Sequence, residues 1–265
     1  MQQGGEGAAA RAGLPDLSGQ TVLVTGASGL IGRGIAERFA LAGAAVVLHY
    51  HRDRESATRL SDELRARGHQ VITEGADLTD ETACAALVER AAVWSGRLTA
   101  LVNNAGVQPV LGLASMTAAE WRHVLDTNLL GAFACTQAAA RVMGAKGGGT
   151  VTHIASIEGS QPARLHAHYC ASKAALIMHA RAAALEYGHL GIRVNTVSPG
   201  LIDRPGLSEQ WPEGVRRWER SAPLVRRGRA EDIGDACVFL ASGMARWVSG
   251  HDLVVDGGVS AAPTW

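Results

Sequence analysis

Short apolar runs rich in β-branched residues alternate along the chain with longer segments whose apolar residues recur every three or four positions. The first pattern is typical of buried strands and the second of helices that cover them. Alternation of the two predicts an α/β fold with a parallel, doubly wound sheet. The pattern predicts strands at 21–24, 45–50, 70–73, 100–102 and 150–154, and helices at about 55–67, at 118–143 and through the alanine-rich stretch around 169–185.

A glycine-rich turn follows the first predicted strand. It reads Thr25-Gly26-Ala27-Ser28-Gly29-Leu30-Ile31-Gly32 and leads into a segment with helical spacing. In a strand–turn–helix unit, backbone N–H groups and the helix N-terminus can hold a pyrophosphate. Gly26 would make the tight turn, Gly29 would keep side chains out of the phosphate path, and Gly32 would let the helix approach the sheet. A purely structural turn is the alternative.

The second predicted strand ends in Tyr50, His51 and Arg52. In a dinucleotide-binding fold, an acidic residue at this point binds the ribose 2′-hydroxyl of NAD, whereas a basic residue accommodates the 2′-phosphate of NADP. Tyr50 stands where the acid is expected, so His51 and Arg52 favour NADP(H) over NAD(H). Two alternatives stay open, because Arg52 could be a solvated loop residue and Asp53 follows closely.

Polar residues also follow the next two predicted strands. Asp77 and Leu78 come after the third, where Asp77 could hydrogen-bond an adenine amino group or cap the next helix. Asn103-Asn104-Ala105-Gly106 follows the fourth and suits a tight backbone bend in a binding crevice, or a simple turn. Within the helix predicted at 118–143, Asn128 lies among apolar residues and needs a partner or a purpose there.

Tyr169 and Lys173 are four residues apart in an alanine-rich helical stretch, so they share one helix face. A neighbouring ammonium favours the phenolate, which would let Tyr169 act as an acid or base near neutral pH. Ser156 follows the strand at 150–154, and the loop before Tyr169 is long enough for the two hydroxyls to face each other. By itself, a tyrosine and a lysine at this spacing can also occur by chance.

Charge and composition narrow the function classes. The 265 residues contain 25 lysines and arginines against 25 aspartates and glutamates, which gives no support for a nucleic-acid or membrane-surface partner. No apolar run reaches the roughly 18 residues of a membrane span. Residues 1–18 are predicted to be a disordered leader without the apolar core of a secretory signal. The four cysteines show no CxxC spacing, so we expect buried free thiols in a reducing cytoplasm and no metal site. They are Cys84, Cys135, Cys170 and Cys237.

Taken together, the motifs resemble the short-chain dehydrogenase/reductase family in its single-domain branch, over about residues 19–260. The resemblance implies a Rossmann-type sheet of about seven strands, a single domain at 19–265, and a homotetramer or homodimer. The matching residues are Thr25-Gly26 through Gly32, Asp77, Asn103-Asn104-Ala105-Gly106, Asn128, Ser156, Tyr169, Lys173, Ser198-Pro199-Gly200 and Asp256-Gly257-Gly258.

The same resemblance implies roles for the site residues. Hydride would move between C4 of a nicotinamide and a carbonyl carbon, with Tyr169 as proton donor or acceptor. Lys173 would lower the pKa of Tyr169 and hold the nicotinamide ribose, Ser156 would hold the substrate oxygen, and Asn128 would keep a water that links Lys173 to solvent. Cofactor contacts are expected from Gly26, Ser28, Gly29, Leu30, Ile31, His51, Arg52, Asp77, Leu78, Asn104, Ala105, Gly106, Tyr169, Lys173, Pro199, Gly200 and Ile202.

Two positions depart from the family pattern. Leu30 stands where the single-domain branch has a glycine, and Arg204 stands where a threonine commonly holds the nicotinamide carboxamide. The segment at 201–229, the expected substrate cover, contains seven arginines and three glutamates. It is either an ordinary solvated helix face or a docking surface for an anionic partner. Trp211 and Trp218, seven residues apart, are predicted to share one helix face.

The expected reaction is NADP(H)-dependent interconversion of a ketone and a secondary alcohol. Similarity to 3-oxoacyl-[acyl-carrier-protein] reductase-like ketoreductases favours a small carbonyl substrate such as a 3-oxoacyl thioester, which an acyl carrier protein could deliver. An NAD-dependent sugar or polyol dehydrogenase is the alternative within the enzymes. A non-catalytic dinucleotide-binding sensor or scaffold is the alternative from another class, although a sensor has no need of Ser156, Tyr169 and Lys173 together.

Overall fold

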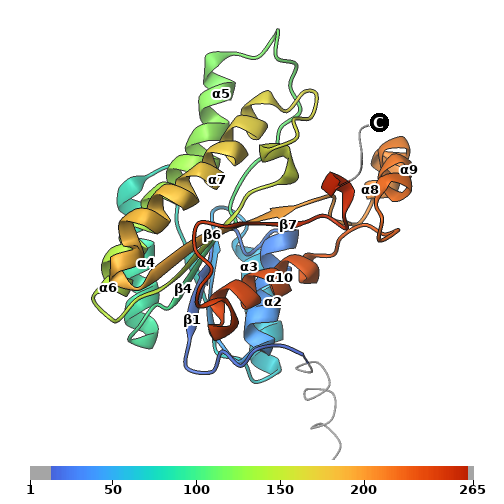
Figure 1. Cartoon of the computed structure of the whole chain (residues 1–265). Coiled ribbons are helices and arrows are strands. Elements are labelled where there is room, and N and C mark those ends of the chain that lie inside the picture. The colour runs from blue at the N-terminus through green and yellow to red at the C-terminus, as the bar shows by residue number, and fades with distance from the viewer. Residues whose placement is uncertain (1–12, 262–265) are drawn as a thin grey trace, which may run out of the picture.

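Seven parallel strands form one sheet, as the sequence predicts. The computed structural model describes residues 13–261, and Figure 1 shows the sheet between two layers of helices. The strands are β1 Thr21–Val24, β2 Ala45–Tyr50, β3 Val71–Gly75, β4 Ala100–Asn103, β5 Gly149–Ile154, β6 Ile192–Pro199 and β7 Asp252–Val255. They are arranged across the sheet in the order β3-β2-β1-β4-β5-β6-β7.

Helices cover both faces of the sheet, so the central strands are buried on both sides and consist of nearly continuous apolar residues. One core contains side chains of α2, α3 and α10, and the other those of α4, α6 and α7. The described residues contain no helix long and apolar enough to cross a bilayer. The helices are α2 Leu30–Leu41, α3 Arg54–Ala66, α4 Glu81–Ser95, α5 Ala118–Leu125, α6 Gly131–Gly144, α7 Ala167–Tyr187, α8 Leu207–Gln210, α9 Pro212–Ser221 and α10 Ala230–Ala241.

The strand order reverses next to β1. Val22 of β1 is in register with Val46 of β2 on one side and with Ala100 of β4 on the other. The crossovers that follow β1 and β4 therefore run in opposite directions, which opens a crevice at the carboxyl ends of these two strands. The glycine-rich turn and the two asparagines of the sequence lie at this crevice.

The helix predicted at 118–143 consists of three pieces. Thr117 and Glu120 form a reciprocal capping box that starts α5, which ends at Leu125. A π-helical turn at 126–130 then joins α5 to α6. Periodicity could not reveal this turn, since its apolar residues continue the helical pattern. Wide turns of this kind often occur at functional sites, and this one contains Asn128.

The ordered part of the domain begins before residue 19. Residues 1–12 of the predicted leader lie outside the described residues. Leu17, however, is 1% exposed, and its amide donates to the Ala42 carbonyl at 2.8 Å. Leu17 thus packs in the core on the α2 side and does not belong to a disordered leader.

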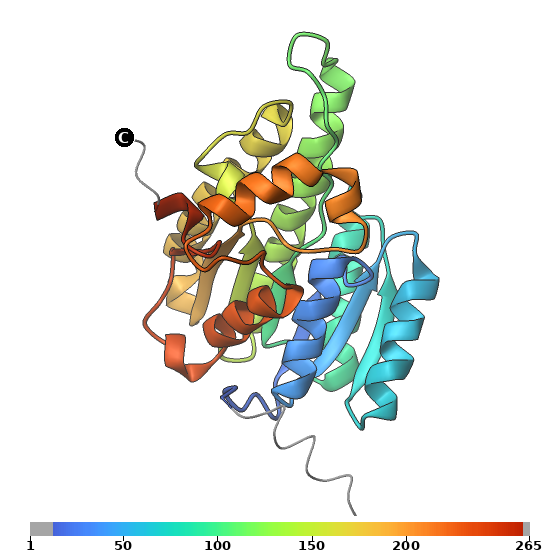
Figure 2. The same ribbon diagram turned by 90° about the vertical axis from the view of Figure 1, so that its right-hand side faces the viewer.

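Helices α8 and α9 lie across one end of the sheet, apart from the two helical layers (Figure 2). They form the helical part of the predicted substrate cover at 201–229. The prediction of one shared face for its tryptophans was wrong, because Pro212 starts α9 and leaves Trp211 outside the helix, 47% exposed. Trp218 packs inward, where a Cβ on Gly200 would lie 2.6 Å from its ring.

Candidate active site

The glycine-rich turn presents backbone to the crevice. Gly26 has φ +63°, and a Cβ there would lie 2.9 Å from the Ala105 Cα. A Cβ on Gly32 would collide with the Gly26 carbonyl. The Asn104 amide holds the turn by donating to the carbonyls of Thr25 at 2.9 Å and Gly26 at 3.1 Å. Only a backbone without side chains fits here, as a bound pyrophosphate requires.

The start of α2 also fits an anion. Gly29 is its N-cap and supplies no side-chain cap, and the first turn contains no acidic residue. The first N–H groups of α2 are therefore available to a phosphate. Leu30 begins the helix with a partly exposed side chain, while Ile31 packs against the core and Ser28 is half-buried. The departure at Leu30 leaves the glycines of the turn in place.

His49 of β2 holds the glycine-rich turn in place through a hydrogen bond, and the sequence did not indicate this function. Its side chain is 1% exposed, with Nδ1 accepting from the Gly26 amide at 3.0 Å. Nε2 then carries the hydrogen and donates to the Ala76 carbonyl at 3.1 Å. Burial lowers the pKa of His49 to about 4, so the ring is neutral. The available signal was a histidine in an otherwise apolar strand next to the predicted cofactor site.

At the carboxyl end of β2, Arg52 has no ion pair within the described residues, whereas its neighbours Asp53 and His51 contact other side chains or backbone groups. Asp53 caps α3 by accepting from the Ser56 amide at 3.0 Å. His51 lies 3.6 Å from Asp77, whereas Arg52 is exposed and has no ion pair within the described part of the chain. Asp77 accepts from Thr79 in its own loop and does not cap the next helix.

Asp80 is the cap of α4 instead, accepting from the amides of Thr82 and Ala83. The helix-cap alternative for Asp77 was therefore wrong, and its neighbour Leu78 is buried against Gly131 of α6. The Asp77 carboxylate stays at the rim of the crevice.

The structure brings Ser156, Tyr169 and Lys173 together. Ser156 follows β5, and its hydroxyl lies near enough to the Tyr169 phenol to lower the pKa of that phenol. Lys173 Nζ lies 5.4 Å from the centroid of the Tyr169 ring and donates to the Ile154 carbonyl at 2.7 Å. These side chains come from the end of β5 and one face of α7, as the sequence predicts. A buried hydroxyl, phenol and ammonium thus meet at one point of the crevice.

Burial dominates the protonation of this group. Burial raises the pKa of Tyr169 to about 12, against a smaller lowering by the nearby Ser156 hydroxyl. It lowers the pKa of Lys173 to about 8. Burial therefore outweighs the lowering of the Tyr169 pKa that was expected from Lys173, because low polarity disfavours the phenolate. The phenol is protonated at neutral pH.

Asn128 faces this group from the π-helical turn. Its Oδ1 accepts from the Val107 amide at 2.8 Å, and its Nδ2 donates to the Val107 carbonyl at 3.0 Å and to Ser172 Oγ at 3.1 Å. The asparagine therefore pairs both backbone groups of the loop after β4. A Cβ on Gly106 would lie 3.1 Å from its Oδ1 and 3.7 Å from Lys173 Nζ, so Gly106 passes close to both.

The carboxyl end of β6 closes the opposite side of the crevice. Pro199 ends the strand, and Gly200 packs between Trp218 and Asp256. Ile202 pairs with Gly228 through an isolated bridge, which ties the cover segment to the sheet edge.

Arg204 does not replace the threonine of the family pattern, since its guanidinium donates to Gln210 on the exposed surface at 2.7 Å. The buried indole N–H of Trp218 has no partner among the described residues. It is thus an unsatisfied donor next to Gly200.

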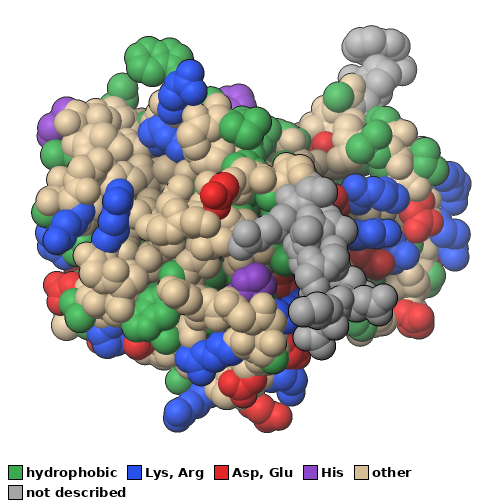
Figure 3. Space-filling view, turned by 90° about the horizontal axis from the view of Figure 1, so that it is seen from below, with side chains coloured by type: hydrophobic (Ala, Val, Ile, Leu, Met, Phe, Trp, Pro, Cys, Tyr) green, Lys and Arg blue, Asp and Glu red, His purple; other side chains and the backbone are tan. Residues whose placement is uncertain are grey.

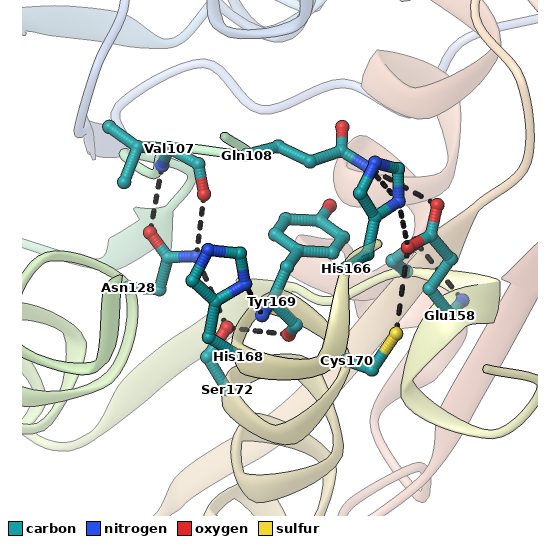
Figure 4. Close-up of polar contacts among 10 residues, drawn as sticks. Val107, Gln108, Asn128, Glu158, His166, His168, Tyr169, Cys170 and Ser172 are labelled. Carbon is teal, nitrogen blue, oxygen red and sulfur yellow. Dashed lines mark hydrogen bonds and ion pairs between the residues drawn. The ribbon is translucent and has the colours of Figure 1, made fainter. Parts of the chain in front are cut away.

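A second polar group lies beside Tyr169, and sequence reasoning missed it. Gln108, Glu158 and His166 come from three separate segments and are joined by hydrogen bonds (Figure 4). Their spacing in the sequence follows no known pattern, so only the fold reveals that they meet.

The arrangement as a whole can exchange a proton with a bound oxygen beside a dinucleotide. The proton would pass through Tyr169, the turn at Gly26–Gly32 would hold a pyrophosphate, and Lys173 lies where it could reach a ribose.

Known proteins share both the sequence and the fold. A family model described as "Enoyl-(Acyl carrier protein) reductase" matches residues 26–260. Cis-4-hydroxycyclohexanecarboxylate dehydrogenase of Sinomonas cyclohexanicum is 38% identical over 244 residues, 91% of this chain and 97% of that protein. L-rhamnose 1-dehydrogenase (NAD(P)(+)) of Azotobacter vinelandii is 39% identical, over 91% of this chain and 96% of its own.

A solved structure of 7α-hydroxysteroid dehydrogenase with NADH and 7-oxo glycochenodeoxycholic acid is 34% identical with a TM-score of 0.87, covering 92% of this chain and 95% of that one. The chain therefore belongs to the short-chain dehydrogenase/reductase family, as an enzyme of its single-domain form that acts on CH–OH groups.

Proposed function

We propose that the protein interconverts a secondary alcohol and a ketone and prefers NADP(H) to NAD(H). The observation that supports the reaction is the meeting of Ser156, Tyr169 and Lys173 beside a turn that fits a pyrophosphate. Bound NAD(P)⁺ would take the hydride from the carbinol carbon at C4 of its nicotinamide. Tyr169 would release its own proton toward solvent and take the hydroxyl proton, so that alcohol and oxidised cofactor give ketone, reduced cofactor and one proton.

The side chains divide the work at the substrate oxygen. Ser156 donates a hydrogen bond to it and stabilises the charge that develops in the transition state, a contribution of about 3 kcal/mol for one such donor. Tyr169, whose pKa burial raises to about 12, is protonated at neutral pH and ready to donate to a ketone. Lys173, with its pKa lowered to about 8, can pass the proton on toward solvent, and Asn128 would hold the water that receives it.

The preference for NADP(H) rests on the end of β2. Asp53 is engaged as the cap of α3, so it is poorly placed to bind a ribose 2′-hydroxyl. Arg52 is exposed beside it without an ion pair in the described structure and can meet a 2′-phosphate. The remaining contacts of the cofactor are proposed to be those expected from the sequence.

Titration with NADPH and NADH, followed by nicotinamide fluorescence, tests this preference. We expect tighter NADPH binding and a loss of at least about tenfold in NADPH affinity for Arg52→Ala, with NADH unchanged, because a hydrogen bond between charged groups is lost. Arg67→Ala, at the far end of α3, is the matched control. Tighter binding of NADH by the wild type would contradict the proposal and favour the alternative, an NAD-dependent sugar or polyol dehydrogenase.

The proposed substrates are small molecules with a secondary hydroxyl, in keeping with the hydroxylated rings in the names of the relatives. A 3-oxoacyl thioester delivered by an acyl carrier protein is a second candidate. Exposed Arg216, Arg217 and Arg220 favour it, since no ion pair engages them among the described residues. Figure 3 shows basic side chains, with acidic ones among them, on the side where Figure 1 draws α8 and α9. Loss of turnover of a carrier-bound, but not a free, thioester on replacing the three arginines by alanine would support it.

We further propose a homotetramer or homodimer in the cytoplasm. Phe133 of α6 and Met178 and Leu185 of α7 are exposed apolar side chains on neighbouring helices, and β7 is an edge strand. A second copy could cover both surfaces. The four cysteines are free and buried, which suits a reducing compartment. Light scattering of the purified protein tests the assembly, and a monomeric mass would contradict it.

A further inference from the structure

Gln108, Glu158 and His166 form a polar cluster beside the phenol. Gln108 lies in the loop after β4, Glu158 in the short 3₁₀ turn at 157–159, and His166 at the N-cap of α7. Glu158 Oε1 accepts from Gln108 Nε2 at 3.1 Å, and its Oε2 lies 2.9 Å from His166 Nδ1. Cys170 Sγ is 3.7 Å from the same Oε2. The carboxylate therefore joins three segments that are far apart in the sequence.

The cluster borders the two side chains that would handle the substrate oxygen. The His166 and Tyr169 rings are edge to face, with centroids 6.2 Å apart. The Glu158 amide donates to Ser156 Oγ at 3.1 Å. In Figure 4 the cluster lies on one side of Tyr169, while Asn128 lies on the other. The cluster is therefore adjacent to the place where a substrate oxygen would meet Tyr169 and Ser156.

The cluster remains able to bind a ligand. The side chains of Glu158 and His166 are each 19% exposed, so they are neither sealed in the core nor free in solvent. A carboxylate offers about four acceptor positions. Three donors, Gln108, His166 and Cys170, occupy three of these positions on Glu158. Among the described residues, no partner occupies the remaining position, the carbonyl oxygen of Gln108 or Nε2 of His166. The two oxygens accept hydrogen bonds, and so does Nε2 in the neutral ring whose Nδ1–H donates to Glu158.

The hydrogen-bond acceptors and the negative charge of this cluster determine which kind of ligand it can bind. Hydroxyl groups donate to such acceptors, whereas a plain hydrocarbon ring would bury them without a partner, which is unfavourable. A second carboxylate would be repelled at this short range. The chemistry thus favours a neutral substrate with more than one hydroxyl.

We infer that Gln108, Glu158 and His166 bind a second hydroxyl of the substrate, so that the enzyme prefers neutral polyhydroxylated compounds to simple alcohols and to hydroxy acids. The inference rests on the proposed function, because it requires that an alcohol reacts at Tyr169. Glu158 is then the specificity-determining residue. Gln108 and His166 hold its carboxylate in place and complete the binding surface.

A matched set of alcohols tests the inference. Cyclohexanol has only the reacting hydroxyl, the cis and trans 1,2-cyclohexanediols add a second, and cis-4-hydroxycyclohexanecarboxylate adds a charge. The oxidation of each by wild type, Glu158→Gln and Glu158→Ala is followed with NADP⁺ and with NAD⁺. Glu89→Gln, an exposed glutamate on α4, is the control. NADPH binding and thermal unfolding show whether each variant is folded.

We expect the wild type to oxidise at least one diol about tenfold more efficiently than cyclohexanol, the effect of one hydrogen bond to a charged group. Glu158→Ala should remove that advantage mainly by raising KM for the diol, with a loss at least about tenfold larger for the diol than for cyclohexanol. Glu158→Gln should raise the efficiency toward the hydroxy acid, because the repelling charge is gone. Structural damage would not produce a gain.

Three results would overturn the inference. One is a wild type that prefers cyclohexanol or the hydroxy acid to both diols. Another is an equal loss for all substrates in both Glu158 variants, which would make the cluster a structural support of α7. The third is no effect of either variant. If the folded wild type oxidises none of the alcohols with either cofactor, the proposed function itself fails, and the inference fails with it.

Discussion

Burial determines the chemistry of individual side chains at this site. Tyr169 and Lys173 are both shifted toward their neutral forms, with pKa values of about 12 and about 8. His49 is neutral for the same reason and acts through its two ring nitrogens, which join the glycine-rich turn to the end of β3. At this scale the sequence predicted that Ser156, Tyr169 and Lys173 lie together, and it gave no sign that His49 holds the glycine-rich turn.

Replacing His49 by alanine should weaken cofactor binding without touching the cofactor. The change leaves the buried Gly26 amide without its acceptor, and such a loss costs about 1–3 kcal/mol. We expect roughly tenfold weaker binding of NADPH in fluorescence titrations. His189→Ala, an exposed histidine far along the chain, should bind as the wild type does. Wild-type affinity in His49→Ala would show that the turn holds its shape without the imidazole.

Elements with a local cause were predictable, and elements with a long-range cause were not. Strands β1 to β5, the turn at 25–32 and the helix around Tyr169 follow from apolar spacing and glycine, and their bounds agree closely with the structure, whereas β6 and β7 were not predicted from spacing. The π-helical turn around Asn128 depends on hydrogen bonds to Val107 in another loop. The cluster around Glu158 needs three segments to meet. Neither leaves a periodic signal in the sequence.

The glycine-rich turn gives a sharp test at the level of an element. Gly32→Ala places a methyl group against the Gly26 carbonyl and 2.7 Å from Asn104 Nδ2, so turn and helix must separate. We expect a loss of about 1–3 kcal/mol in the free energy of unfolding and at least tenfold weaker cofactor binding. The matched control is Gly188→Ala, where a Cβ meets nothing within 4 Å.

Chemical denaturation and NADPH titration of the two glycine variants provide the measurement. A Gly32→Ala protein as stable and as tightly binding as Gly188→Ala would refute the close approach of helix α2 to the turn.

The interior of the whole molecule contains polar side chains among its apolar ones, including two neutral histidines. His153 is fully buried between Asn103 and His179, and burial lowers its pKa to about 3, as it lowers that of His49 to about 4. Both rings are held in the core by hydrogen bonds in their neutral forms. The stability of the entire fold is thereby coupled to pH.

This coupling predicts a loss of stability in mild acid. The unfolded chain takes up protons on these two histidines below about pH 6.5, whereas the folded chain does so only near pH 3–4. The stabilisation is therefore complete above pH 6.5 and falls as the pH drops, by up to about 1.4 kcal/mol per pH unit for each histidine. Urea unfolding between pH 7 and 5.5, where few carboxylates of the unfolded chain take up protons, measures it. A free energy of unfolding that stays constant over this range would contradict the burial of neutral histidines.

The central claim is that this enzyme transfers hydride to or from an alcohol carbon while Tyr169 exchanges the proton. Tyr169→Phe removes only the phenol oxygen and keeps the ring packed against His166. The most direct test compares turnover of secondary alcohols and their ketones by wild type and Tyr169→Phe, with NADPH binding measured on both. We expect a fall in kcat of at least about a hundredfold with cofactor affinity retained, since general acid–base catalysis contributes on that scale. Turnover in Tyr169→Phe equal to that of the wild type would contradict the account.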